Sequence, residues 1–460
     1  MWRRRFWGCL EPKGVCVVDP ARATEPRSFL VPKRIPLGWR VVPLSQVLEE
    51  RRMKVSDDEF APLSVTMDGI VPQRDHVAKT SDGSNRKGVR RGDLVINSRS
   101  DRKGASGVSP QDGSVSLISI VMRPVGVESR FLHHLVRSFA FQEEFYRRGQ
   151  GIVADLWTTR FPALKRIEVA LPPRNDQARI ADFLDRETAH IDALIEKKER
   201  LIALLEEKRA ALITRAVTKG LDPNVPMKDS GVEWIGEIPE HWEVVSLGRL
   251  ITNIQQGWSP IAEDRLAAEG EWAVIKLSAV KPREFVETEH KTLPATLNGD
   301  SRIEIKQGDL LITRANTPEL VGTACVVSSV RERVMMSDLV YRVNTLDQVV
   351  CRRYLVHWLT SMAGRSHVEI EARGASRSMV KISTALIRRW PCILPPMREQ
   401  NEIAAHLEKN AAHSGALQSE LSRSITLLRE RRSALITAAV TGQIDIDEYE
   451  ASQDALQSQE

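Results

Sequence analysis

The stretch Leu-Pro-Pro-Arg-Asn-Asp-Gln at 171–177 opens a segment that runs to residue 222 and occurs twice in the chain. The second copy opens with Leu-Pro-Pro-Met-Arg-Glu-Gln at 394–400. Both copies close on Ala-Leu-Ile-Thr-x-Ala-Val-Thr, at 211–218 and 434–441. Every matched pair of positions is 223 residues apart (394 minus 171, 434 minus 211), so the register is kept without a gap. Such a repeat predicts a chain of two halves, each ending in the same helical unit.

The repeated segment has the pattern of a long helix that needs a partner. Pro172-Pro173 ends the preceding strand because proline cannot continue a strand ladder, and Asp176 suits a helix N-terminus. Apolar residues then recur at spacings of three, four and seven, as in a coiled-coil seam. A helix of about 42 residues spans roughly 60 Å and is only marginally stable alone. We therefore expect the two copies to pair antiparallel through a helix-pairing interface of Leu184, Ile191, Leu194, Leu201, Leu205, Leu212, Leu407, Leu417, Ile425, Leu428 and Leu435.

The rest of the chain alternates with these helices. In each half a Gly-Asp turn leads into an alternating strand, at 91–97 and 307–313, and apolar residues recur at helical spacing over 129–147 and 350–371. The expected fold class is α+β: two mixed α/β domains separated by two long antiparallel helices that form a coiled coil, with a pseudo-twofold internal repeat. The expected parts are a poorly ordered basic tail (1–34), a first domain (35–170), a first helix (171–220), a linker (221–240), a second domain (241–393), a second helix (394–445) and a polar tail (446–460).

The composition excludes several classes of protein. A net charge of +5 is a mild excess that matters only where basic residues cluster. No apolar run approaches the roughly 20 residues of a membrane span, and no apolar region of a signal peptide follows the Arg-rich start. The five cysteines are scattered without metal-site spacing, which predicts reduced thiols in a cytoplasmic protein.

Motifs for catalysis are missing from the sequence. It contains no GxGxxG or GxxxxGK[ST] phosphate loop, no HExxH and no GxSxG, so we expect no catalytic and no metal-binding residues. Glu206, Glu207 and Lys208 resemble part of a nuclease triad, but they share a solvated helix face. His190 and His413 occupy equivalent positions in the two helices, and we interpret them as interface residues.

Clustered basic residues are the main functional signal. Within 86–103 seven cations alternate with Ser and Asn, and the second domain has smaller groups of Arg, Asn and Gln. Cations attract DNA phosphates, and Arg, Asn and Gln can read base edges. A solvated charged loop is the alternative reading of the first cluster. The DNA-binding candidates are Arg86, Lys87, Arg90, Arg91, Arg99, Arg102 and Lys103 in the first domain, and Gln255, Gln256, Arg314, Asn316, Arg373, Arg377 and Lys381 in the second.

Together these residues resemble the specificity subunits of type I restriction–modification systems. The resemblance rests on the paired Leu-Pro-Pro and Ala-Leu-Ile-Thr motifs and on Asp-Ser-Gly-Val-Glu-Trp-Ile-Gly-Glu-Ile-Pro-Glu-His-Trp at 229–242, and it covers about 35–445. The first domain lacks this lead-in and has the Arg-rich tail instead. The two domains also end differently, at 149–157 and 374–376, so the target halves are expected to differ.

The resemblance implies a function without chemistry in this chain. Two target recognition domains would each read one half of a bipartite site in double-stranded DNA. The two spacer helices would set the distance between the half-sites and dock two modification (methyltransferase) subunits that carry S-adenosylmethionine. Restriction (translocase and nuclease) subunits using ATP and Mg²⁺ would join them. No cofactor in this chain and no membrane partner are expected.

Two alternatives belong to other classes. One is a fused methyltransferase–nuclease, against which the missing cofactor motifs argue. The other is a helical interaction protein that captures modification subunits without reading DNA.

Overall fold

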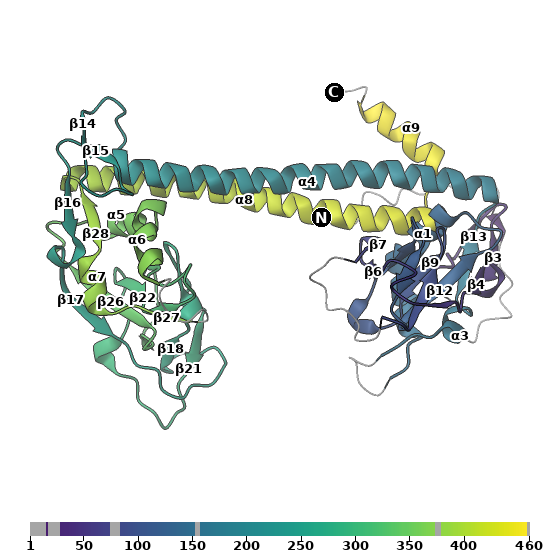
Figure 1. Cartoon of the computed structure of the whole chain (residues 1–460), viewed down its shortest axis with the longest axis horizontal. Helices are drawn as coiled ribbons and strands as arrows, with labels where there is room; N and C mark the ends of the chain where they lie inside the picture. Colours follow the sequence, from purple (N-terminus) through teal and green to yellow (C-terminus); the bar gives the residue numbers. More distant parts are fainter. Residues whose placement is uncertain (1–14, 17–27, 74–82, 152–156, 373–378, 458–460) are drawn as a thin grey trace. The chain divides into compact units, whose positions relative to one another are not determined.

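The structure, a computed structural model, describes residues 15–16, 28–73, 83–151, 157–372 and 379–457. The chain forms two compact units, one of residues 1–198 with 423–460 and one of residues 199–422. Each unit holds one α/β domain and parts of two long helices, α4 (Arg174–Lys219) and α8 (Met397–Val440), as Figure 1 shows. The predicted α+β class is therefore confirmed. The unit boundaries fall inside the helices, because each domain packs on parts of both.

Both long helices begin just after a Pro-Pro pair and end before a glycine in the left-handed conformation. Gly220 has φ of 76° and Gly442 has φ of 68°, which suits the residue after a helix C-terminus. Within the first unit Asp192 of α4 pairs with Arg432 of α8, and within the second Glu206 pairs with Gln418. From the first pair to the second, the residue number rises along α4 and falls along α8. The two helices therefore run antiparallel.

The predicted helix-pairing residues differ in burial. Leu184, Ile191, Leu407, Ile425 and Leu435 are buried. Leu194, Leu205, Leu212, Leu417 and Leu428 are half-buried. Leu201 is 42% exposed, which contradicts its place in a buried seam, and His190 and His413, interpreted as interface residues, are exposed. Leu407 belongs to the core of the second domain, so part of the apolar stripe faces a domain.

The first domain is built on antiparallel sheets. The largest has the strand order β10-β9-β12-β4 and a smaller one the order β11-β8-β5. Strands β13 and β3, β6 and β7, and β1 and β2 form two-stranded pairs. The bounds are β1 Val15–Cys16, β2 Ile35–Pro36, β3 Arg40–Pro43, β4 Leu48–Glu50, β5 Lys54–Val55, β6 Leu63–Thr66, β7 Gly69–Pro72, β8 Arg86–Val89, β9 Leu94–Asn97, β10 Ser106–Val108, β11 Gly113–Val115, β12 Ser119–Pro124, β13 Glu168–Leu171, α1 Ser129–Arg137, α2 Phe139–Arg147 and α3 Phe161–Leu164.

The second domain repeats this framework. Its main sheet has the order β17-β26-β22-β24, which matches β4-β12-β9-β10 in both order and chain sequence. A second sheet, β21-β18-β25, includes a parallel pair, unlike its counterpart. The bounds are β14 Met227–Asp229, β15 Glu237–Pro239, β16 Glu243–Ser246, β17 Ile251–Gln256, β18 Ala273–Ile275, β19 Val280–Lys281, β20 Glu284–Phe285, β21 His290–Thr292, β22 Leu310–Thr313, β23 Ala315–Asn316, β24 Ala324–Val326, β25 Val334–Met335, β26 Val340–Thr345, β27 Val380–Lys381, β28 Pro391–Leu394, α5 Arg352–Leu359, α6 Met362–Ala372 and α7 Thr384–Arg389.

Each predicted helix of the domains is two helices. The 129–147 segment breaks at Ser138, which has extended backbone angles and accepts a hydrogen bond from the amide of Phe141 at the start of α2. The 350–371 segment breaks between α5 and α6, where the hydroxyl of Ser361 accepts from the amide of Gly364. Serine caps of this kind start a new helix without disturbing the apolar spacing, so the spacing alone does not reveal them.

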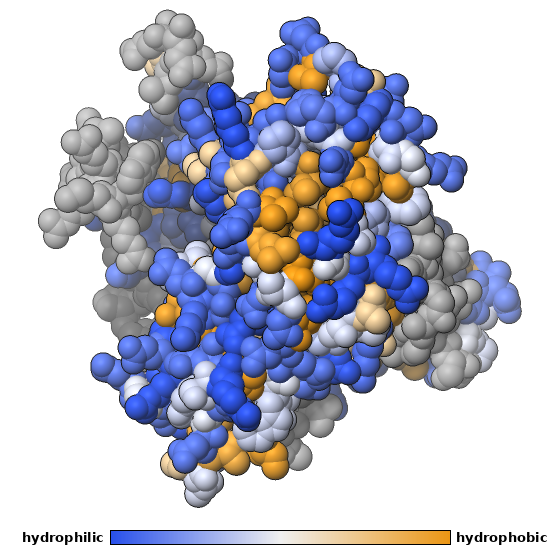
Figure 2. Space-filling view, turned by 90° about the vertical axis from the view of Figure 1, so that its left-hand side faces the viewer, coloured by the Kyte–Doolittle hydropathy of each residue, from blue (hydrophilic) through white to orange (hydrophobic). Residues whose placement is uncertain are grey.

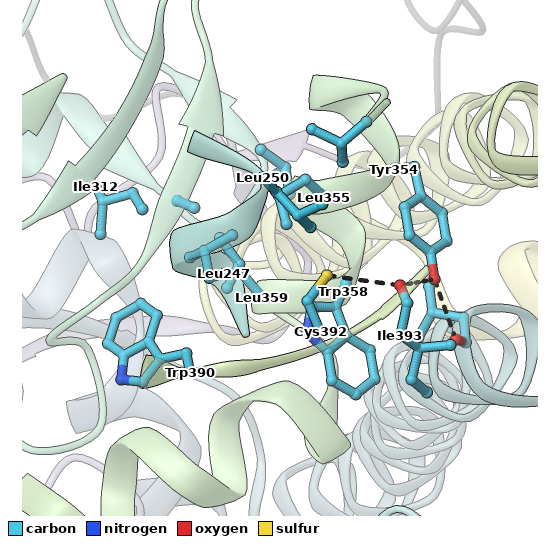
Figure 3. Close-up of a cluster of buried hydrophobic side chains, with 14 of the residues drawn as sticks. Leu247, Leu250, Ile312, Tyr354, Leu355, Trp358, Leu359, Trp390, Cys392 and Ile393 are labelled. Carbon is cyan, nitrogen blue, oxygen red and sulfur yellow. Dashed lines mark hydrogen bonds between the residues drawn. The ribbon is translucent and has the colours of Figure 1, made fainter. Parts of the chain in front are cut away.

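The core of the second domain closes over the end of α4. Figure 3 shows Tyr354 and Trp358 of α5 beside Cys392 and Ile393 of β28. The buried Tyr354 hydroxyl lies 3.0 Å from the carbonyl oxygen of Ile393 and 3.4 Å from that of Val217 in α4. This one side chain therefore joins the strand, the domain helix and the long helix.

The two ends of the chain depart from their expected description. Residues 446–457, expected as part of a polar tail, form α9 (Ile446–Gln457). In α9, Tyr449 packs edge-on against Phe183 of α4, and Asp447 pairs with Arg179. Most of the predicted basic tail lies outside the described residues, but β1 pairs with β2 and Leu30 is buried.

The exterior is mainly polar. Figure 2 shows a predominantly hydrophilic face on which apolar side chains gather in a band. In the described part of the chain, no helix is both long and apolar enough to cross a membrane.

The same glutamine fastens each long helix to its domain. Gln177 and Gln400, the last residues of the two Leu-Pro-Pro motifs, are buried. The Gln177 side chain accepts a hydrogen bond from the amide of Glu128, before α1, and donates to the carbonyl of Pro172. The Gln400 side chain accepts from the amide of Cys351, before α5, and donates to Pro395 and Val349. The motif is thus a helix anchor.

Candidate nucleic-acid interface

The first two residues of the predicted basic cluster point inward. Arg86 on β8 is only 4% exposed, and its guanidinium donates to the hydroxyl and carbonyl oxygens of Ser114. Lys87 donates to the carbonyl of Ser119 at 2.6 Å. Burial lowers the pKa of both groups. The buried Arg86 is not available to DNA in this structure, because it satisfies oxygens of Ser114, whereas the half-buried Lys87 stays a prediction.

The remaining cations separate at the two ends of β9. Arg90 and Arg91 precede the strand, where Arg90 pairs with Asp112 at 2.6 Å and its guanidinium lies over the ring of Phe60. The Arg91 amide also donates to Asp112, and these hydrogen bonds lower the pKa of that carboxyl group. The four-residue strand separates this turn from the residues after β9 by about 13 Å.

Exposed cations gather after β9. Arg99 and Arg102 are exposed, and the Arg102 side chain lies 3.8 Å from Asp101. Lys103 pairs with Glu143 of α2, and its ammonium lies 5.0 Å from the centre of the Tyr146 ring. Three cations therefore share one side of the first domain beside α2, in an arrangement that suits contact with phosphate oxygens.

Two aromatic side chains complete this surface, and the sequence reading missed them. Tyr146 and Trp157 stack with ring centres 6.1 Å apart, and the Trp157 indole N–H donates to the carbonyl of Tyr146. Both line a hollow together with Arg99, Lys103 and Gln142. Because the two aromatics are 11 positions apart in the chain, only the helix-to-loop contact brings them together. We call Arg99, Arg102, Lys103, Gln142, Tyr146 and Trp157 the first-domain surface.

In the second domain the structure gathers polar side chains around Asp338, in the loop before β26. Arg314 donates to the Asp338 carbonyl at 3.2 Å, and the amide of Gln256 donates to the same oxygen at 3.4 Å. Ser259 donates to the Asp338 carboxylate at 2.5 Å. Trp258, between them in the chain, is 45% exposed. Arg314 and Gln256 are therefore brought together, although the sequence separates them.

The other second-domain candidates have different surroundings. Gln255 is held by Arg342 and by the carbonyl of Arg302, so it serves the structure of the domain. Asn316 and Lys381 lie on paired strands β23 and β27, and Lys381 is exposed. Arg373 and Arg377 lie outside the described residues.

Chemistry at cysteines or metals finds little support in the described structure. Burial raises the pKa of the Cys325 thiol to about 12, and that of Cys392 further, so these thiols stay protonated at neutral pH. Within the described ranges, no group of three or more His, Cys, Asp and Glu residues has the geometry to hold a metal ion.

Sequence comparison connects these features to named proteins. No family model matches the chain. The chain is 28% identical over 246 residues to the type I restriction enzyme EcoEI specificity subunit of Escherichia coli; the match covers 53% of the chain and 41% of that relative. It is 22% identical over 446 residues to the EcoKI specificity subunit of E. coli K12, covering 89% of the chain and 90% of the relative.

Structure comparison agrees on the fold. A chain from a solved structure described for complex assembly and conformational transition of a type I R-M system matches with a TM-score of 0.61. It is 18% identical, and the match covers 90% of this chain and all of that one.

The duplicated α/β domains and the two long antiparallel helices define a class of two-domain proteins with an internal repeat. The relatives above show which members of this class the chain resembles. It is similar to the specificity subunits of type I restriction–modification systems.

Proposed function

We propose that this chain is the non-catalytic, sequence-specific DNA-binding subunit of a type I restriction–modification complex. Each α/β domain reads one half of a bipartite target in double-stranded DNA, and the chain positions the enzyme's other subunits on that target. The observation that carries the proposal is the first-domain surface, where three exposed cations lie beside a stacked aromatic pair.

The chemistry of this surface suits DNA recognition. Arg99 and Arg102 can contact phosphates, which supplies affinity and orientation. The Gln142 side-chain amide donates to the carbonyl of Arg137 at 3.0 Å, which leaves its oxygen to accept a hydrogen bond from a base edge. An exposed aromatic face can stack on a base. The Lys103 ammonium is already partly neutralised by Glu143, so we expect it to contribute less than Arg99 or Arg102.

The second domain reads by a different set of groups. Arg314 and Gln256 are positioned by Asp338, while Lys381 and Asn316 lie on a separate two-stranded ribbon. Apart from shared strands, these groups have no counterpart in the first-domain surface. Two domains with one framework and different side chains are expected to read different half-sites.

The partners and cofactors in this proposal follow from the family. Two modification subunits carrying S-adenosylmethionine dock on the paired helices, and restriction subunits using ATP and Mg²⁺ join them in the cytoplasm. This chain binds none of these cofactors. Many polar side chains of α4 and α8 are exposed and are available for contact with other subunits.

The test measures DNA binding by the complex with modification subunits as salt is raised. Replacing Arg99 and Arg102 by Ala should reduce the slope of log affinity against log salt by up to about two, since each lost phosphate contact removes about one. The control is Arg123→Ala, an exposed arginine of the same domain that pairs with Glu49. An unchanged slope in the double variant, or an equal loss in the control, would refute this interface.

A further inference from the structure

A cavity with both apolar and polar walls lies in the second unit between α4, α8 and α5. It has a volume of about 200 Å³, enough for several water molecules. Apolar residues form part of its wall, and its polar lining is Lys208, Arg209, His357, Asn410, His413 and Ser414. Among the described residues that line it there is no Asp or Glu, so the cavity is cationic.

Two residues that line this cavity each have a buried nitrogen atom that lacks a hydrogen-bond partner among the described residues. His357 is only 6% exposed, and its Nδ1 is buried without a partner among the described residues. The Nε of Arg209 is likewise buried without a hydrogen-bond partner among the described residues. Leaving a buried polar group unpaired costs about 1–3 kcal/mol. Burial, and to a smaller extent the nearby charges of Arg283, Arg209 and Arg353, lower the pKa of His357 to about 4.

The internal repeat supplies a reference for this site. The counterparts of His357 and Arg209, 223 positions away, are His134 and Arg432 in the first unit. His134 Nε2 lies 2.7 Å from Asp185, and Nη2 of Arg432 donates to Asp192 at 3.1 Å, although Arg432 Nε, like Arg209 Nε, has no hydrogen-bond partner among the described residues. At the same place in the first unit, each of these two side chains therefore faces a carboxylate of the chain itself.

The second unit lacks one of those carboxylates, because the counterpart of Asp192 is Gly415. The counterpart of Asp185 is Glu408, which pairs with Arg353 at 3.0 Å, as Asp185 also pairs with Arg130 at 3.2 Å. The lining is also smaller, because Thr188 and Ile191 correspond to Ala411 and Ser414. Compared with the first unit, the second unit therefore has both less side-chain volume and less negative charge at this place.

We propose that this cavity is an oxyanion-binding site, in which Arg209 and His357 hold a phosphate or carboxylate group that takes the place of the missing side chain. Lys208 and His413, both exposed, line the same cavity, and Lys208 adds positive charge. The same chemistry can come from two sources, a free anion or an acidic side chain of another subunit.

Gly415 makes a sharp test available. A Cβ added there would meet no atom within 4 Å, so a side chain fits. Gly415→Asp restores the carboxylate that Asp192 supplies in the first unit and should occupy the site internally. Gly415→Ala is the matched control, because it changes helix propensity without adding charge. Arg209→Gln removes the cation and serves as a second variant if Gly415→Asp folds poorly.

The measurement is isothermal titration of the full chain with inorganic phosphate. Parent and Gly415→Ala chains should bind, whereas Gly415→Asp and Arg209→Gln should bind at least about tenfold more weakly, the loss of one charge-assisted hydrogen bond. Equal phosphate affinity in the parent and in both variants would overturn the proposal.

A second arm identifies the source of the anion. Assembly with modification subunits, which depends on the proposed function, is measured for Gly415→Asp and Gly415→Ala. If phosphate does not bind the parent chain but Gly415→Asp alone weakens assembly, the anion is a side chain of the partner. If phosphate does not bind and both variants assemble like the parent, the oxyanion site is refuted, while DNA reading by the first-domain surface is unaffected.

Discussion

The two halves of the chain agree where each long helix meets its domain and differ where each domain presents its loops. The side chains of Gln177 and Gln400 accept a hydrogen bond from the amide of the residue before α1 and before α5, respectively. The two glutamines are 223 positions apart, and so are the two residues that donate. In contrast, the end of β9 leads to Arg99 and Lys103 beside Tyr146, and the equivalent end of β22 leads to Arg314 at Asp338. The framework is duplicated in detail, whereas the surfaces share only their position. Selection on assembly and selection on target recognition can therefore act on separate residues.

The anchor glutamines give the largest expected effect. Gln400→Leu should destabilise the second unit by about 3 kcal/mol and Gln177→Leu the first by about 2 kcal/mol, because buried backbone groups lose their partners. Gln400 makes one hydrogen bond more than Gln177, which sets the order. Hydrogen exchange of peptides from each unit measures both losses.

A matched control is Gln418→Leu, which removes a half-buried glutamine of the same helix, α8, that donates to Glu206 of α4. If the control costs as much as Gln400→Leu, or if each anchor variant destabilises the other unit, the equivalence of the two anchors is wrong.

The second prediction uses the equivalent histidines. His357 has a pKa of about 4 in the folded chain, against about 6.5 when unfolded. Between these values the unfolded state binds more protons, so stability is complete above pH 6.5 and is lost as pH falls towards 4. At pH 4.5 the loss should be about 2–3 kcal/mol and should disappear in His357→Leu.

Urea unfolding in phosphate-free buffer at several pH values measures this effect. His134→Leu is the comparison, because Asp185 opposes the lowering of the pKa of His134. Because the pKa of His134 is expected to be lowered less than that of His357, His134→Leu should change the pH dependence of stability less than His357→Leu does. A pH profile unaltered by His357→Leu would show that this histidine does not titrate as a buried neutral group.

The smallest effect concerns the glycines that end the long helices. Gly442→Ala would place a Cβ 2.6 Å from Pro36, while Gly220→Ala would place one 3.2 Å from Trp242. Both positions have positive φ, which costs about 1 kcal/mol for Ala, and the tighter contact should bring Gly442→Ala to about 2 kcal/mol. Thermal unfolding of both variants and of Gly231→Ala, a positive-φ glycine in open space, separates strain from crowding. Equal costs for all three would mean that the contact with Pro36 relaxes freely.

The sequence predicts the framework well because its signals are local. The 223-residue register locates both long helices to within a few residues, and the Gly-Asp turns correctly place β9 and β22. Breaks at Ser138 and Ser361 are missed because a serine cap leaves the apolar period intact.

The candidate interface is predicted less well, because the charge of a side chain does not reveal whether it points into the domain or towards solvent. Arg86 and Arg99 look alike in the sequence, but Arg86 meets Ser114 inside the sheet while Arg99 is exposed. Leu201 likewise follows the coiled-coil spacing and is exposed. Tyr146 and Trp157 join the surface only through a contact between α2 and a following loop, which no periodicity encodes.

The C-terminal helix α9 makes the two halves different for a protein that binds to the long helices. It lies against α4 through Tyr449 on Phe183 and through acidic side chains on Arg179 and Arg186. After the matching end of α4, the chain instead forms the β14–β15 hairpin. Two identical proteins approaching the two ends of the duplicated framework would thus encounter unlike neighbours, and their binding steps would be distinguishable in order and in affinity.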